Sequence, residues 1–182
     1  MADLTTLANV KAWANIKTAD DDALLTRLIS AASEFIQTWL NRSFASQAYN
    51  EVRDGNGNCR MVFAESPVTA VSSLVVNGRP IPASAGFGQA GYSFDKTLLI
   101  LTGYIFERGI GNVLISYTAG YATTPPEIEQ ACIELISLRY KERERIGHQS
   151  KSLAGETVTF FIKDMPDSVQ TTLNNYRKVI PL

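Results

Sequence analysis

The residues best suited to catalysis are His148 and two serines that follow it, Ser150 and Ser152. A histidine beside a serine can act as the general base for a nucleophilic hydroxyl, as in a hydrolase. Such a pair also needs a third group that orients the imidazole, and the Gly/Gln/Ser context of His148 supplies none. A small hydrolase stays an open alternative, but we expect His148 to be a solvated loop residue and the chain not to be an enzyme.

Few side chains are available to hold a metal ion. A structural zinc site needs about four nitrogen, sulfur or oxygen ligands, and the chain has one histidine and two distant cysteines, Cys59 and Cys132. We expect both thiols to be buried. The three aspartates at 20–22 could bind a hard cation, but a place at the start of a helix, where the backbone favours negative charge, explains them better. No metal and no other cofactor is expected.

Two glycine-rich stretches match phosphate loops by letter but not by context. Gly86, Gly88 and Gly91 fit the spacing G-x-G-x-x-G, yet Tyr-Ser-Phe follows them instead of a helix. The Gly-Asn-Gly at 55–57 lacks the lysine and the helix that a phosphate loop requires. We expect it to be the turn of a hairpin between strands at 49–53 and 59–63.

Periodicity places helices at both ends of the chain and strands in the middle. Helices are expected over 4–16, 22–41, 127–146 and 166–178, and short strands recur between 47 and 121. In the first helix, Leu7, Val10, Trp13 and Ala14 share one face by their spacing. The second carries one wide apolar stripe, made of Leu24, Leu25, Leu28, Ile29, Ala32, Phe35, Ile36, Trp39 and Leu40.

This pattern predicts an α+β fold. A helical bundle of about four helices is formed by residues 1–46 and 122–182, and a small antiparallel β domain is inserted at 47–121. The spacing of the strands is typical of a small barrel or sandwich.

Composition narrows the classes of function. The 182 residues carry a net charge of −1, whereas proteins that grip DNA directly are usually basic. No stretch approaches the roughly 18 apolar residues of a membrane span, so no membrane partner is expected. The first residues, Met-Ala-Asp, do not begin a signal peptide, which predicts a protein made and kept in a cytosol.

The third expected helix ends in a dense run of charges at 139–145. The simplest interpretation is a solvated helix end with internal ion pairs; the alternatives are a subunit interface or pore-facing surface, or a DNA-packaging or DNA-binding accessory module. Residues 147–157 are expected to be flexible, and 157–162 are β-prone. A β-prone run beside a polar hinge suits a docking arm that adds a strand to a neighbour.

Five stretches, in this order, resemble the head–tail connector (adaptor) family of tailed bacteriophages. They are LTTLANVKAWANI, DDDALLTRLISAASEFIQTWLNRSF, SPVTAVSSLVVNG, the segment 117–160 from YTAGY to ETVTF, and MPDSVQTTLNNYRKVIP. The β insertion is larger than in the compact all-helical members of that family.

The resemblance implies a structural role in the virion, at the interface between head and tail, after assembly in the host cytoplasm. Such proteins form a homo-oligomeric ring, usually of twelve copies, beneath the portal protein. The ring extends the channel through which double-stranded DNA passes without sequence-specific binding, and it presents a surface to a downstream neck or tail-completion protein. Closed rings need two different contacting faces on each subunit.

We expect the helix at 127–146 to bury Ile128, Leu135 and Ile136 and to turn its arginines outward. The last helix should lie near the portal or line the channel. The residues expected at interfaces are Arg139, Lys141, Arg143, Arg145, Lys151, Thr157, Phe160, Phe161, Tyr176 and Arg177.

Overall fold

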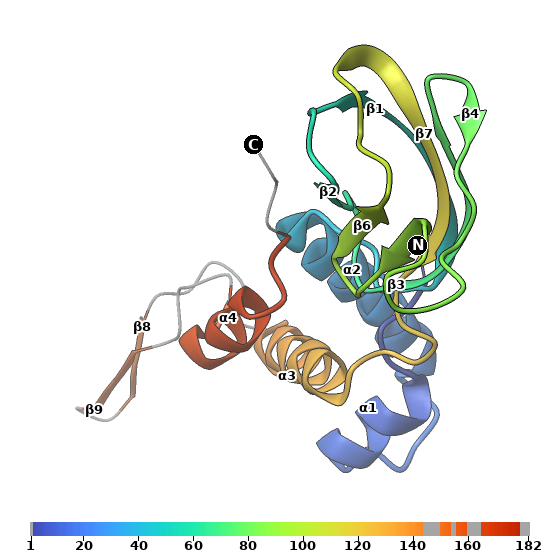
Figure 1. Cartoon of the computed structure of the whole chain (residues 1–182). Helices are drawn as coiled ribbons and strands as arrows, with labels where there is room; N and C mark the ends of the chain where they lie inside the picture. The colour runs from blue at the N-terminus through green and yellow to red at the C-terminus, as the bar shows by residue number, and fades with distance from the viewer. Residues whose placement is uncertain (1, 144–149, 154–155, 160–164, 179–182) are drawn as a thin grey trace. The chain divides into compact units, whose positions relative to one another are not determined.

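The computed structural model describes residues 2–143, 150–153, 156–159 and 165–178. The chain divides into two compact units, which we call the helical unit (Met1–Ser43 with Thr124–Arg177) and the β unit (Phe44–Thr123 with Lys178–Leu182). Figure 1 shows helices in the first and antiparallel sheets in the second. The expected α+β fold is confirmed.

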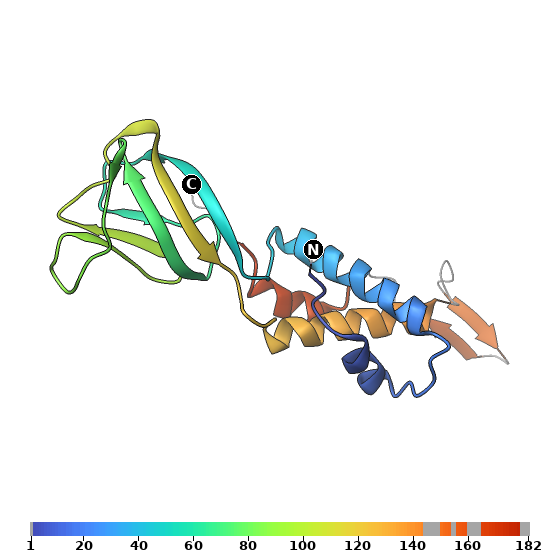
Figure 2. The ribbon, with the colours of Figure 1, turned by 90° about the vertical axis from the view of Figure 1, so that its right-hand side faces the viewer.

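The described residues of the helical unit form four helices, and α3 contacts each of the other three. Their bounds are α1 Leu7–Ala14, α2 Asp22–Leu40, α3 Pro126–Glu142 and α4 Asp167–Asn174. Figure 2 shows α2 and α3 side by side along most of their lengths. Local signals set the ends of these helices: the side chain of Thr6 caps α1 by accepting from the N–H of Asn9, and Pro126 occupies the first turn of α3.

The expected apolar stripes form the core of the helical unit. On α2, the buried positions include Leu25, Ile29, Ala32, Ile36 and Leu40. On α3 they include the three residues expected there, Ile128, Leu135 and Ile136.

One residue of the apolar face expected on the first helix is exposed rather than buried. Trp13 is 57% exposed, because α1 has only about two turns and its buried position is Val10.

In the β unit, the residues that the structure describes form seven strands in two antiparallel sheets. Their bounds are β1 Gln47–Gly55, β2 Arg60–Val62, β3 Val68–Val76, β4 Arg79–Pro80, β5 Gly91–Phe94, β6 Leu98–Thr102 and β7 Gly109–Ala119. The larger sheet has the order β1-β7-β3-β4 and the smaller one β2-β6-β5. Side chains from both sheets share one core, including Leu74, Ile115 and Tyr117 from the larger and Met61, Leu99 and Leu101 from the smaller. The two sheets therefore pack as a small sandwich.

The expected hairpin between 49–53 and 59–63 is wrong. β1 pairs with β7 along its length, and β2 pairs with β6. The glycine-rich turn instead carries the chain from one sheet to the other. Gly57 has a φ of 79° and donates its N–H to the carbonyl of Phe106 at 2.7 Å, a conformation that glycine adopts without strain.

A further hairpin is formed by β8 (Ser150–Leu153) and β9 (Glu156–Thr159), which pair antiparallel. The expectation of a flexible segment over 147–157 is therefore wrong where β8 and the start of β9 lie. Strand structure begins earlier than the β-prone run suggested, since Ser150 pairs with Thr159. In the described part of the chain, no helix has the length and apolar character that crossing a bilayer requires.

Candidate assembly interface

The groups that could have supported catalysis do not form a described site. His148 lies outside the described residues, and Ser150 and Ser152 belong to β8. Within the described ranges, no group of three or more His, Cys, Asp or Glu side chains could hold a metal ion. Cys59 is exposed, contrary to expectation, whereas Cys132 is buried. Burial raises the pKa of the Cys132 thiol to about 11, so this thiol stays protonated at neutral pH and reacts slowly.

Asp21 and Asp22 lie at the start of α2, as expected, and their side chains contact neighbouring helices. The side chain of Asp21, at the N-cap position, makes no capping hydrogen bond; it accepts from the hydroxyl of Tyr140 on α3. Asp22 pairs with Lys11 of α1, whose Nζ lies 2.5 Å from Asp22 Oδ1. The two carboxylates therefore join three helices, and this structural role explains them without a bound cation.

A groove of about 620 Å³ lies between the first half of α2 and the C-terminal end of α3. We call it the arginine groove. Its apolar residues, Leu24, Leu28 and Ala31, follow one side of α2 at the spacing of successive turns. The full lining is Leu24, Arg27, Leu28, Ala31, Arg139, Glu142 and Arg143.

Aromatic rings position two of the arginines in this groove. The guanidinium of Arg139 lies 4.9 Å from the ring centre of Phe35. That of Arg143 lies 4.1 Å from the ring centre of Tyr140 and also donates to the carbonyl of Tyr140 at 2.7 Å. Cation–π contacts of this kind hold a guanidinium in place without neutralising its charge.

The arginine groove has an excess of positive charge. Its lining contains three guanidinium groups and one carboxylate, Glu142. Neither Arg27 nor Arg139 forms an ion pair with a described residue. The groove therefore offers an apolar floor and the guanidinium groups of Arg27 and Arg139, which are not paired with a described carboxylate.

A second groove, of about 470 Å³, lies between α3 and α4, and we call it the acidic groove. Its charged residues are two glutamates. Glu127 accepts from the hydroxyl of Tyr176 at 2.9 Å, and Glu134 accepts from Gln130 Nε2 at 3.0 Å. The full lining is Pro126, Glu127, Gln130, Ala131, Glu134, Ser168, Val169, Thr172 and Asn175.

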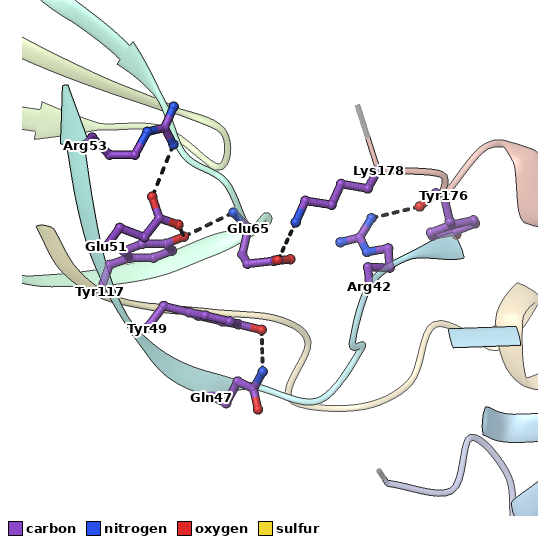
Figure 3. Close-up of polar contacts among 9 residues, drawn as sticks. All are labelled: Arg42, Gln47, Tyr49, Glu51, Arg53, Glu65, Tyr117, Tyr176 and Lys178. Atoms are coloured by element: carbon purple, nitrogen blue, oxygen red, sulfur yellow. Dashed lines mark hydrogen bonds and ion pairs between the residues drawn. The ribbon is translucent and has the colours of Figure 1, made fainter. Parts of the chain in front are cut away.

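The expected interface residues do not lie together. Arg139 and Arg143 line the arginine groove, whereas Tyr176 contacts the acidic groove and its carbonyl accepts from Arg42 at 2.9 Å (Figure 3). Lys141 and Arg177 are exposed. Lys151 belongs to β8 and Thr157 to β9, and Arg145, Phe160 and Phe161 lie outside the described residues.

Sequence reasoning missed Arg27 and the acidic groove. One signal could have indicated the first: the α2 stripe has nine apolar positions, which is wider than one partner helix covers. Leu24, Leu28 and Phe35 are accordingly only half-buried. The acidic groove had no such signal, because it depends on how α4 packs against α3.

The outer face of the larger sheet in the β unit carries no charge over three rows. In register, Leu114 of β7 lies between Val52 of β1 and Val75 of β3. Val52 is 64% exposed and Leu114 is 47% exposed. The rows, which we call the uncharged sheet face, are Val52, Leu114 and Val75; Asn50, Ser116 and Ser73; and Ala48, Thr118 and Ala70.

Glu51 and Arg53 of β1 point the other way, into a half-buried polar cluster (Figure 3). The hydroxyl of Tyr117 donates to Glu51, and Arg53 pairs with the same carboxylate at 3.3 Å. The N–H of Glu65 donates to the Tyr117 hydroxyl at 3.1 Å, and Lys178 Nζ lies 2.5 Å from the Glu65 carboxylate.

Tyr117 is held neutral in this cluster. Burial, followed by its hydrogen bond to Glu51, raises the pKa of the Tyr117 hydroxyl well above its ordinary value. The neutral hydroxyl donates to the Glu51 carboxylate and accepts from the backbone N–H of Glu65, and these two hydrogen bonds fix β7 within the cluster.

Comparison with known proteins identifies the family. The model of the head completion protein family matches residues 3–179. No curated protein matches the sequence significantly.

Among solved structures, the chain is similar to one from the neck of an empty gene transfer agent (GTA) particle computed with C6 symmetry, with 21% identity and a TM-score of 0.57, covering 97% of this chain and 90% of that one. It is also similar to one from the neck of a native GTA particle computed with C12 symmetry, with 18% identity and a TM-score of 0.55, covering 100% and 96%. At these identities the likeness concerns the fold.

The family match spans nearly the whole chain, and the resemblance to head–tail connectors seen in the sequence is confirmed. The chain belongs to the head completion protein family, with the role of a structural head–tail adaptor.

Proposed function

We propose that the chain forms a ring of twelve copies in the neck of a virion, below the portal protein, and that DNA passes through the ring without sequence-specific binding. The observation that carries this proposal is the family match over residues 3–179. It is supported by a fold shared with chains from GTA necks computed with C12 and C6 symmetry. Subunits are made in the host cytoplasm and enter the particle during assembly.

The surfaces of the subunit suit this role. A closed ring requires contact between two different faces of neighbouring subunits, and the helical unit has two grooves with opposite charge. The uncharged sheet face of the β unit is a third surface, available to the portal or to the next neck or tail-completion protein. A subunit with three distinct surfaces can hold sister copies and other virion proteins at once.

The proposed role includes no chemical reaction. The half-buried carboxylates of the β unit, Glu51 and Glu65, are already paired with Arg53 and Lys178. Replacing His148 with alanine should leave assembly unchanged. Turnover of a small molecule that is lost in this variant would support the hydrolase alternative.

The direct test is reconstitution. The full chain is mixed with the portal protein of the same particle and imaged by electron microscopy. We expect a ring coaxial with the portal, with twelvefold symmetry in class averages. A chain that stays separate from the portal and from every neck component would contradict the proposal.

We also propose that residues 148–162, which include the β8–β9 hairpin, are a docking arm. Replacing them with a Gly/Ser linker of equal length should leave the fold intact but abolish incorporation into particles. Circular dichroism and thermal unfolding report the fold, and the protein content of purified particles reports incorporation. Loss of soluble protein in the linker variant would show that these residues belong to a core.

The arginine groove is the observation that favours the alternative of a DNA-binding accessory protein, because guanidinium groups bind phosphates. A gel-shift assay with duplex DNA at about 0.15 M salt separates the two functions. An adaptor with a net charge of −1 should show little affinity for free duplex. Tight binding that falls steeply with salt would favour the accessory role.

A further inference from the structure

We propose that the arginine groove of one copy binds the acidic groove of the next copy in the ring. This inference rests on the proposed ring and specifies which two faces meet. It assigns the contact to the helical unit, through α2 and the C-terminal end of α3 on one side and through α3 and α4 on the other.

The two grooves occupy different parts of α3. The acidic groove uses Glu127 and Glu134, and the arginine groove uses Arg139 and Arg143. At 1.5 Å per residue, the midpoints of these two pairs lie about 16 Å apart along the helix axis. At about 100° per residue, Arg139 lies roughly 140° around the helix from Glu134, and Arg143 roughly 180°. One subunit therefore presents the two grooves in different directions, as a head-to-tail contact requires.

The charges of the two grooves are complementary. The arginine groove holds three guanidinium groups against one carboxylate, and the lining of the acidic groove has two carboxylates and no basic residue. Arginine forms paired, directional hydrogen bonds with carboxylates, so the contact fixes orientation as well as attraction.

The apolar parts of the grooves match too. Leu24, Leu28 and Ala31 form the floor of the arginine groove, and Ala131 and Val169 lie in the acidic groove. An apolar floor gains from contact with protein side chains, whereas a DNA backbone would offer it phosphates and sugars. We therefore assign the arginine groove to a second copy of this chain.

A charge swap tests this pairing, using the full-length chain with the portal protein. Arg27 is exposed and has no ion pair among the described residues, and Glu134 is half-buried on α3. Arg27→Glu places a carboxylate opposite the two carboxylates of the acidic groove. Glu134→Lys places a cation opposite the arginines of the arginine groove. Each single variant should weaken ring formation at least about tenfold in the protein concentration required.

Mixing the two single variants should restore the ring. In a ring where they alternate, the Arg27→Glu groove meets Glu134→Lys, and the unchanged arginine groove meets the unchanged acidic groove. Every contact is then complementary, and alternation closes in a ring with an even number of subunits. The double variant should also form rings on its own. Size-exclusion chromatography with light scattering and electron microscopy measure these outcomes.

Lys17→Glu is the matched control, because Lys17 is exposed in the segment between α1 and α2 and lines neither groove. It makes the same kind of charge change as Arg27→Glu and should leave ring formation unchanged.

The outcomes separate this inference from the proposed function. If the wild-type chain forms no ring with its portal, the proposed function fails. If the wild-type chain forms rings and both single variants do so equally well, the pairing of the grooves is wrong although the ring stands. Single variants that fail without rescue in the mixture, or an Arg27→Glu variant that loses only DNA binding, would also overturn the pairing.

Discussion

The two grooves of the helical unit and the polar cluster on β1 of the β unit place charged side chains in different ways. In the helical unit, arginines and glutamates line two open grooves. In the β unit, Glu51 and Arg53 of β1 turn into the sandwich and pair there, and the outer face of the same strand carries Ala48, Asn50 and Val52.

This difference predicts two kinds of contact from one subunit. Contacts between charge-lined grooves are directional and weaken as salt is added. Contacts on the uncharged sheet face depend on buried apolar area, about 25 cal/mol for each Å². The helical unit is therefore suited to fixing the order of copies around a ring, and the sheet face to broad contact with a different protein.

The largest expected effect compares two leucines, one from each unit. Leu135 of α3 is fully buried and Leu114 of β7 is 47% exposed. Leu135→Ala removes packed core atoms and should lower the free energy of unfolding by about 2–5 kcal/mol. Leu114→Ala should change it by less than about 0.5 kcal/mol. Urea denaturation followed by circular dichroism measures both.

A large loss on Leu114→Ala in the isolated subunit would show that the outer sheet face is covered within one copy. It would then be unavailable to a partner, and the contrast between the units would fail.

A second test concerns the inward polar cluster of the β unit. Tyr117→Phe removes the hydroxyl that donates to Glu51 and accepts from the N–H of Glu65. The Glu51 carboxylate and the N–H of Glu65, both half-buried, would each lose a hydrogen-bond partner. We therefore expect the free energy of unfolding to fall by about 1–3 kcal/mol. Tyr49→Phe is the control, since the Tyr49 hydroxyl accepts only an exposed hydrogen bond from Gln47. Equal losses for the two substitutions would show that the cluster stabilises the β unit no more than an exposed hydrogen bond does.

The same tyrosine predicts a dependence on pH. Its pKa is raised in the folded state, so the unfolded state loses this proton first, near pH 10. The contribution of Tyr117 is fully present below about pH 10 and is lost as pH rises above it. The wild-type chain should lose stability above pH 10 more steeply than the Tyr117→Phe variant. Parallel pH profiles for the two chains would contradict this assignment.

The smallest expected effect is chemical modification of the two cysteines, one in each unit. Cys59 of the β unit is exposed, and Cys132 of the helical unit is buried with its pKa raised to about 11. A thiol reagent at pH 7 should modify one cysteine quickly in the folded chain and two after denaturation. Mass spectrometry of peptides shows which cysteine reacts. Fast modification of Cys132 would indicate that α2 and α3 separate readily.

The sequence allowed the helices to be predicted more completely than the sheets, for physical reasons. Helical periodicity and caps are local, so the stripe on α2 and the proline at the start of α3 could be recognised directly. Strand pairing is not local. β1 pairs with β7 and β2 with β6, and the turn at 55–57 therefore suggested a hairpin that the chain does not form.

The candidate interface was predictable only in part. Arg139 and Arg143 were visible as a charge run, but Arg27 joins them only when α2 packs beside α3. The contact between Lys178 and Glu65 joins residues 113 positions apart. No local pattern indicates such a pair.

The ribosome makes β7 after both of the strands that pair with it. Strands β1 and β3 both pair with it, and Ala119 at its end follows Gln47, the first residue of β1, by 72 positions (119 minus 47). At about 5–20 residues per second, a ribosome needs roughly 4–14 s to cover that distance. During this interval the edges of β1 and β3 that later pair with β7 are unpaired, and unpaired strand edges are prone to pair with other chains. Slower translation or a crowded cell should therefore reduce the yield of soluble protein, even when the finished fold is stable.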